Sequence, residues 1–277
     1  MRVLISQIYA PTPVTEIELE LMKKHIDAGD EVSVLRCHRE LVTCHWNPDH
    51  RRSVCNMCQS KFLTADSTID SSRSRISPFV RRVRHSAPAV PPVFASLDEL
   101  KSFSYDGINI GLGVASSVIS KTYKDHNLDT TVYDREISRE LEASIQVYES
   151  AKSEIARQRP DLIYIFNGRI ASSLPLRYLA ASMGIEYRTY EVAGGLNRYL
   201  LRKNATPQDI DATKNEINRL WDEGPENRRE IGESWFEDRR KGMATGIQSF
   251  TGSQQIGLLP DGFDPDKKNI AIYASTI

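Results

Sequence analysis

Two stretches of this sequence have the pattern strand, helix, strand, and this pattern limits the possible folds more than any other feature. Residues 2–8 form a β-branched apolar run, a helical stripe of apolar residues then continues to Gly29, and "EVSVLRC" is typical of a second strand. Further along, "DLIYIFNGR", "SSLPLRYLAASMG" and "IEYRTYEVAGG" repeat the pattern. Two strands joined through a helix belong to one parallel sheet. The sequence therefore predicts an α/β fold in which helices cover both faces of a parallel sheet.

The remaining elements complete a single large domain. Apolar residues from Tyr133 to Ile155 predict a long helix that ends before Pro160, and Thr206 with Pro207 predicts the cap and first turn of another. We place this domain at residues 1–266, with a cysteine-rich insertion at 37–61 and a polar surface loop at 64–95.

Bulk composition gives few indications of partners. Lys and Arg number 36 and Asp and Glu number 37 in the 277 residues, so the net charge of −1 gives no reason to predict a nucleic-acid partner. No apolar run approaches the roughly 20 residues that cross a bilayer, and the N-terminus lacks the pattern of a signal peptide. We expect a cytoplasmic protein, in which paired structural disulfides are unusual.

All four cysteines of the chain fall in one short segment. Cys55-x-x-Cys58 has the spacing with which a backbone turn presents two sulfurs to one ion, and four thiolates close a tetrahedral structural zinc site. An iron–sulfur cluster uses the same ligands, and four reduced thiols without a metal are a third interpretation. The predicted ligands are Cys37, Cys44, Cys55 and Cys58, with His38, His45 or His50 as possible replacements for one sulfur.

A zinc deaminase signature is the rival interpretation of the same segment, because His38-x-Glu40 precedes a Cys-x-x-Cys pair. Only residues 41–54 separate the two halves, which is too short for the helix and strand between them, and no proline precedes Cys55. We therefore prefer a structural metal. Such a site would hold a loop and would not perform chemistry, because all four sulfurs are used as ligands.

Polar side chains follow two of the predicted strands. Asn167, Gly168 and Arg169 come at the end of "IYIFNGR", and Glu191 ends "TYEV" before Gly194-Gly195. Ligands of open parallel sheets bind outside the carboxyl ends of the strands. We predict that Asn167, Gly168 and Arg169 bind substrate hydroxyls or anions and that Glu191 is a catalytic base. A plain turn and a structural salt bridge are the alternatives.

Several separated segments resemble one family. The first βαβ unit with "HIDAGDEVSVLRC", together with "CNMC", "YDGINIGLGVASSVIS", "IYIFNGR", "SFTGSQQIGLLP" and "KKNIAIYAST", is similar to the N-terminal half of bacterial glycosyltransferases of the GT-B type that build capsules, lipopolysaccharides and other surface polysaccharides. The resemblance covers nearly the whole chain, and the cysteine pattern with "FNGR" is its most specific part.

The resemblance implies a Rossmann-like acceptor domain whose partner domain holds the nucleotide-sugar donor. Residues 267–277 would begin that second domain, and the chain would be a hexosyl-type transferase acting on a glycan or lipid-linked acceptor at the inner face of the membrane. A metal-stabilised binding or regulatory domain without turnover is the second hypothesis. A different α/β nucleotide-binding enzyme is the third.

Overall fold

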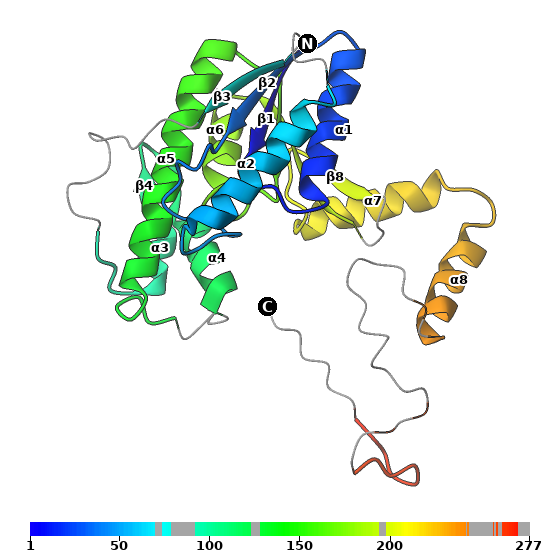
Figure 1. Cartoon of the computed structure of the whole chain (residues 1–277). Helices are drawn as coiled ribbons and strands as arrows, with labels where there is room; N and C mark the ends of the chain where they lie inside the picture. The colour runs from blue at the N-terminus through cyan, green and yellow to red at the C-terminus, as the bar shows by residue number, and fades with distance from the viewer. Residues whose placement is uncertain are drawn as a thin grey trace. The chain divides into compact units, whose positions relative to one another are not determined.

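A mostly parallel sheet organises the larger part of the molecule (Figure 1). The computed structural model describes residues 1–69, 74–78, 92–122, 128–193, 198–241, 243, 257, 259 and 262–270. Parts of three predicted segments lie outside these residues: Gly194-Gly195 after the predicted strand, positions 70–73 and 79–91 of the polar loop, and positions 271–277 of the expected second domain. The chain divides into unit 1, Met1–Val192 with Tyr199–Asp209, and unit 2, Ala193–Arg198 with Ile210–Ile277.

Within the described residues, six strands form the main sheet in the order β3-β2-β1-β6-β7-β8. The five strands β3, β2, β1, β6 and β7 are parallel to one another, and β8 is antiparallel to β7. A short hairpin, β4 (Ser104–Tyr105) and β5 (Ile108–Asn109), stands apart. The sheet strands are β1 (Arg2–Gln7), β2 (Glu31–Arg36), β3 (Ser74–Pro78), β6 (Leu162–Phe166), β7 (Glu186–Val192) and β8 (Tyr199–Lys203).

Helices connect these strands. The helices of unit 1 are α1 (Val14–Asp27), α2 (Arg52–Asp66), α3 (Leu97–Ser102), α4 (Gly111–Thr122), α5 (Asp134–Gln158) and α6 (Leu174–Ser182). Unit 2 contains α7 (Ile210–Asp222) and α8 (Arg228–Arg240), which are joined by a contact of the Arg228 guanidinium with the Trp221 ring at 5.1 Å. Among the described residues, no helix has both the length and the apolar composition needed to cross a membrane.

Helices cover both faces of the sheet, as predicted. Side chains of a strand alternate between the faces, so Val3 and Ile5 of β1 pack with α1, whereas Leu4 packs with α5 and α6. A third buried cluster joins α4 to the N-terminal half of α5. Strand β1 is buried on both sides, which explains why its sequence is an almost continuous apolar run.

Three local predictions were wrong. Cys55 and Cys58 lie on α2 and not on a turn. The segment from Arg52 to Asp66 forms a continuous helix, which packs against α1. The polar loop predicted at 64–95 begins with the end of α2 and contains the edge strand β3. Thr206 does not cap α7, since a separate turn, closed by Asp209 N–H donating to the Thr206 carbonyl, precedes Ile210.

The chain changes direction across the sheet between β1 and β6. From β1 it proceeds outward to β2 and β3, and from β6 it proceeds the other way to β7 and β8. The loops after β1 and β6 therefore leave the carboxyl edge in opposite directions, and ligands of such sheets bind at this kind of position. The fold thus identifies the region around Tyr9 and Asn167 as the candidate site.

A buried polar network lies between the sheet and α1. The hydroxyl of Tyr190 donates to Glu18 Oε1 at 2.5 Å, and both side chains are almost completely buried. Nearby, Arg36 binds Gln7 at 2.8 Å and makes a two-point ion pair with Asp66 at 2.7 and 2.8 Å. Glu18 Oε2 has no hydrogen-bond partner among the described residues. Burial raises the pKa of Glu18 to about 8, although the Tyr190 hydroxyl and Arg36 act in the opposite direction.

We expect Glu18→Gln to stabilise unit 1 at alkaline pH. The folded state retains a proton on Glu18 that the unfolded chain releases above its lower pKa, so stability falls as the pH rises from about 4.5 towards about 8. Gln keeps the acceptor for Tyr190 and cannot ionise. At about pH 9 the Glu18→Gln variant should therefore melt at a higher temperature than the parent. Each kcal/mol gained in the free energy of unfolding corresponds to about 2–4 °C.

Exposed Glu16 on the same helix provides the control. Glu16→Gln removes the same charge, and the parent's decline in melting temperature with pH should persist. If the melting temperature of Glu18→Gln fell with pH as steeply as that of the parent, Glu18 would be ionised in the folded protein over the whole pH range.

Candidate functional site

The loop after β6 brings two of the predicted residues into an unusual backbone conformation. Asn167 has φ +60° and Gly168 has φ +83°, so the chain turns sharply as it leaves the sheet. Asn tolerates this left-handed region better than most residues. A Cβ on Gly168 would lie 2.9 Å from Thr189 Cγ2 and 3.1 Å from Arg177 Cδ. Gly168 is therefore needed for both its backbone conformation and the close packing around it.

Asn167 and Glu191 are joined directly. Asn167 Nδ2 donates to Glu191 Oε2 at 2.7 Å, and the backbone N–H of Val192 donates to Glu191 Oε1 at 3.1 Å. Asn167 itself is 8% exposed, whereas Glu191 is half-buried at the end of β7. The two donors fix the orientation of the carboxylate, and each oxygen keeps a lone pair for a further donor.

Arg169 lies at the outer side of the same loop. Its backbone N–H donates to Asn167 Oδ1 at 3.2 Å, and its exposed guanidinium donates to the hydroxyls of Ser116 at 2.7 Å and Ser120 at 3.4 Å on α4. Burial lowers the pKa of nearby His45, and the positive charges of Lys121 and Arg169 lower it further. The site therefore combines a fixed carboxylate with the exposed guanidinium of Arg169.

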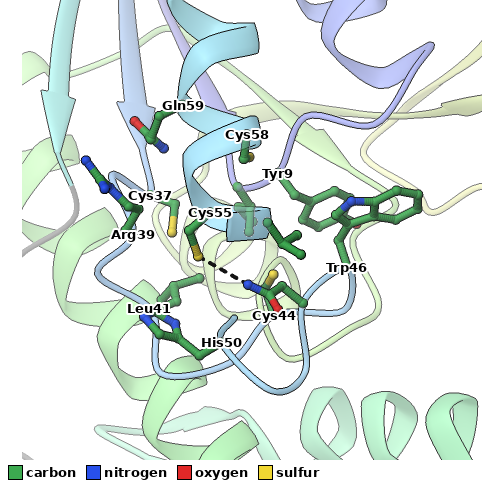
Figure 2. A pocket seen from close by; sticks show the side chains of 13 residues that line it. Tyr9, Cys37, Arg39, Leu41, Cys44, Trp46, His50, Cys55, Cys58 and Gln59 are labelled. Carbon is green, nitrogen blue, oxygen red and sulfur yellow. Dashed lines mark hydrogen bonds between the residues drawn. The ribbon is translucent and has the colours of Figure 1, made fainter. Parts of the chain in front are cut away.

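The four cysteines gather around one small pocket at the carboxyl edge (Figure 2). Cys37 follows β2 and Cys44 lies in the loop beyond it, whereas Cys55 and Cys58 project from successive turns of α2. Apolar side chains of Ile8, Leu41 and Val54 complete much of the lining. Of the three histidines predicted as substitutes, His50 lines this pocket, and His38 and His45 do not.

Burial raises the pKa of three of these thiols. The pKa of Cys37 rises to about 11, and those of Cys44 and Cys58 rise to about 12; neighbouring cysteines add to the effect. Without a metal these thiols are protonated at neutral pH. Within the described ranges, no three His, Cys, Asp or Glu side chains are placed so that they could hold a metal ion. The structure therefore does not support the predicted zinc site on Cys37, Cys44, Cys55 and Cys58.

Tyr9 contacts both the cysteine pocket and the end of β6, and no sequence pattern indicated this beyond its place after β1. Its ring lines the pocket and packs edge-on against Phe166 at 5.4 Å. Its buried hydroxyl has no hydrogen-bond partner in the described part of the chain. Burial raises its pKa well above the ordinary value, and the charges of Glu191 and Cys44 raise it further.

Comparisons with known proteins do not identify the chain. No family model matches it, and no curated protein matches it. Among solved structures it is similar to SsfS6, a glycosyltransferase from Streptomyces sp. SF2575, with 16% identity and a TM-score of 0.30, over 68% of this chain and 38% of that one. It is also similar to the zinc-inhibited form of teicoplanin deacetylase Orf2, with 11% identity and a TM-score of 0.37, over 69% and 67% of the two chains. With TM-scores this low, neither similarity bears on fold or activity.

We expect Gly168→Ala to destabilise unit 1 more than Gly184→Ala. Both glycines have positive φ, at +83° and +67°, and each alanine would cost about 1–2 kcal/mol for its backbone conformation. Only at position 168 does the added Cβ meet close neighbours, which adds about 1–3 kcal/mol of overpacking. Urea unfolding of both variants measures the difference. Equal losses would mean that the loop after β6 relaxes freely.

Proposed function

We propose that the chain is the acceptor-side part of a glycosyltransferase that uses a nucleotide-sugar donor. The observation that carries the proposal is the hydrogen bond from Asn167 to Glu191, which holds a carboxylate at the carboxyl edge of the sheet. The resemblance of "FNGR" and the surrounding segments to surface-polysaccharide glycosyltransferases supports the same function.

The residues at this edge have separate tasks in the proposed reaction. Glu191 accepts the proton of the acceptor hydroxyl, whose oxygen then bonds to the anomeric carbon while the bond to the diphosphate breaks. Asn167 keeps the carboxylate in position through its amide group. The exposed guanidinium of Arg169 orients an anionic or hydroxyl-bearing part of the acceptor, and Gly168 provides the positive-φ turn that leads to Arg169.

The donor is held elsewhere in this proposal. The loop after β1, "YAPTPV", contains no glycine and no diphosphate-binding motif. A second domain beginning near residue 267 would supply that site. Capsule or lipopolysaccharide precursors linked to a lipid would be the acceptors, so the enzyme would work peripherally at the inner face of the membrane.

A binding domain without turnover is the second candidate. It is favoured by the hydrogen bonds that both Glu191 oxygens already accept, since each bond occupies a lone pair that a base would offer to the substrate proton. The two candidate functions predict different effects on turnover when the Glu191 carboxylate is removed.

Glu191→Gln should lower turnover roughly 10²-fold or more in the protein encoded by the complete gene. Gln has nearly the same shape and accepts no proton, so acceptor binding should change little. Nucleotide-sugar consumption with a lipid-linked glycan extract is the measurement, and the 277-residue chain alone should show no transfer.

Glu186→Gln is the matched control, because Glu186 begins the same strand at the opposite edge of the sheet. Full activity is expected for it. A Glu191→Gln variant as active as the parent would remove Glu191 from the mechanism, and transfer by the 277-residue chain would contradict the acceptor-side assignment.

A further inference from the structure

The loop after β6 is held against α4 by buried contacts. The N–H of Ala171 donates to the Ser117 hydroxyl at 2.9 Å, and both residues are buried. A Cβ on Gly113 of α4 would lie 3.1 Å from Leu174 Cβ and 3.3 Å from the Ala171 backbone, so the glycine lets the helix approach closely. The position of this loop relative to α4 is therefore set by packing and does not depend on its exposed side chains.

Arg169 extends from this loop across one turn of α4. Ser116 and Ser120 are four positions apart and so lie on the same face of the helix. Arg169 Nη1 donates to the Ser116 hydroxyl at 2.7 Å and makes a longer contact with the Ser120 hydroxyl at 3.4 Å. Arg169 is exposed and the two serines are half-buried, so a ligand can reach all three groups from solvent.

These three side chains keep several hydrogen-bond donors unused. A hydroxyl that accepts from arginine retains its own proton to donate, and a guanidinium carries N–H groups on all three nitrogens. In the described part of the chain, neither serine hydroxyl donates to an acceptor and no carboxylate pairs with the guanidinium. The cluster therefore combines a positive charge with unused donors, and an oxygen-rich anion is the ligand that matches it.

Two neighbouring cations have the partners that are typical of a structural role. Lys121, the residue after Ser120, forms an ion pair with the buried carboxylate of Glu140. Arg177 of α6 donates its Nε to the Gly168 carbonyl at 2.8 Å. The Arg169 guanidinium has neither kind of partner among the described residues, so its charge is available to a ligand.

The number of donors favours a diphosphate over a carboxylate. A guanidinium alone satisfies a carboxylate through two parallel hydrogen bonds. The hydroxyls of Ser116 and Ser120 add donors beyond that pair, and a diphosphate has enough terminal oxygens to accept from all of them. A carboxylate would leave the two serines without a role.

The cluster lies on the same loop as the proposed catalytic site. The backbone N–H of Arg169 donates to Asn167 Oδ1 at 3.2 Å, and Nδ2 of the same amide donates to Glu191 at 2.7 Å. An acceptor whose glycan is joined to a lipid through a diphosphate carries its reacting hydroxyl and its anion on one molecule. One loop can therefore bind the anion and place the hydroxyl beside Glu191.

We propose that Arg169, Ser116 and Ser120 bind the diphosphate that joins the glycan acceptor to its lipid. This assignment rests on the proposed function and names the anionic group of the acceptor. Arg169 supplies the charge, whereas the two serines supply the neutral donors that distinguish a diphosphate from a carboxylate. No covalent bond changes at this site, because the lipid diphosphate stays attached to the glycan.

The first test measures binding to the 277-residue chain and needs no sugar transfer. Inorganic pyrophosphate should bind, as followed by phosphorus NMR, and geranyl diphosphate should bind at least as tightly. Arg169→Gln should weaken both about 10-fold or more, since hydrogen bonds to a charged group are the strong ones. The double variant Ser116→Ala with Ser120→Ala should weaken both several-fold and leave the weaker binding of acetate unchanged.

Arg159→Gln is the matched control for the loss of charge. Arg159 is also exposed, and it lies before β6 at the opposite edge of the sheet. This variant should bind pyrophosphate as the parent does. Three results would overturn the site: no binding of pyrophosphate to the folded chain, equal affinities for Arg169→Gln and Arg159→Gln, or acetate binding as tight as that of pyrophosphate.

Uridine diphosphate carries the same anion on a nucleoside and separates the two sources of a diphosphate. It should bind no more tightly than geranyl diphosphate. If it bound through Arg169 about 10-fold more tightly, the site would serve the donor, and the assignment to the acceptor would be wrong.

The second test uses the protein encoded by the complete gene. The double serine variant should raise the KM for the lipid-linked acceptor several-fold and change kcat little, because these residues bind and do not react. An unchanged KM would remove the serines from the acceptor site. If the protein transfers no sugar, pyrophosphate binding still decides whether the anion site exists, so the site and the proposed function can fail separately.

Discussion

Parallel pairing of β1 with both β2 and β6 is the constraint on which the rest of unit 1 depends. Parallel strands need a crossover between them, and each crossover begins at the carboxyl edge of the sheet. Because β1 is buried on both faces, its neighbours and their helices have to cover it from two sides. As a result, the loops after β1, β2, β6 and β7 all begin at one edge, and every candidate functional residue of the chain lies there.

That edge holds two different chemical environments side by side. On one side, Asn167 and the end of β7 present a carboxylate fixed by N–H donors. On the other, a largely apolar pocket surrounds the four thiols, and Asn47 Nδ2 donates to the Cys55 sulfur. Tyr9 belongs to both, since its ring lines the pocket while its buried hydroxyl is affected by the charge of Glu191. The residues that directly follow β1, Ile8 and Tyr9, thus line the cysteine pocket.

The predictions that succeeded concerned segments with strong local patterns. The long amphipathic helix α5 and the apolar strands β1, β2 and β6 were recognisable because hydrophobic periodicity is repeated over many residues. The failures concerned segments whose state depends on neighbours. Strand β3 has a polar sequence, "SRISP", and is a strand only because β2 offers it an open edge. The helix carrying Cys55 and Cys58 is stabilised by packing against α1, and its sequence alone suggested a loop.

The sequence by itself determined the class of the fold, the clustering of the cysteines and the presence of polar residues after β6 and β7, since these follow from local composition and order. Only the tertiary structure decided which groups meet. Asn167 and Glu191 are 24 positions apart, and Glu18 and Tyr190 are 172 apart. The rings of Tyr9 and Phe166 meet in the same way. Such contacts depend on how crossover helices pack on the sheet and which strands become neighbours, and no periodicity within a single segment records that information.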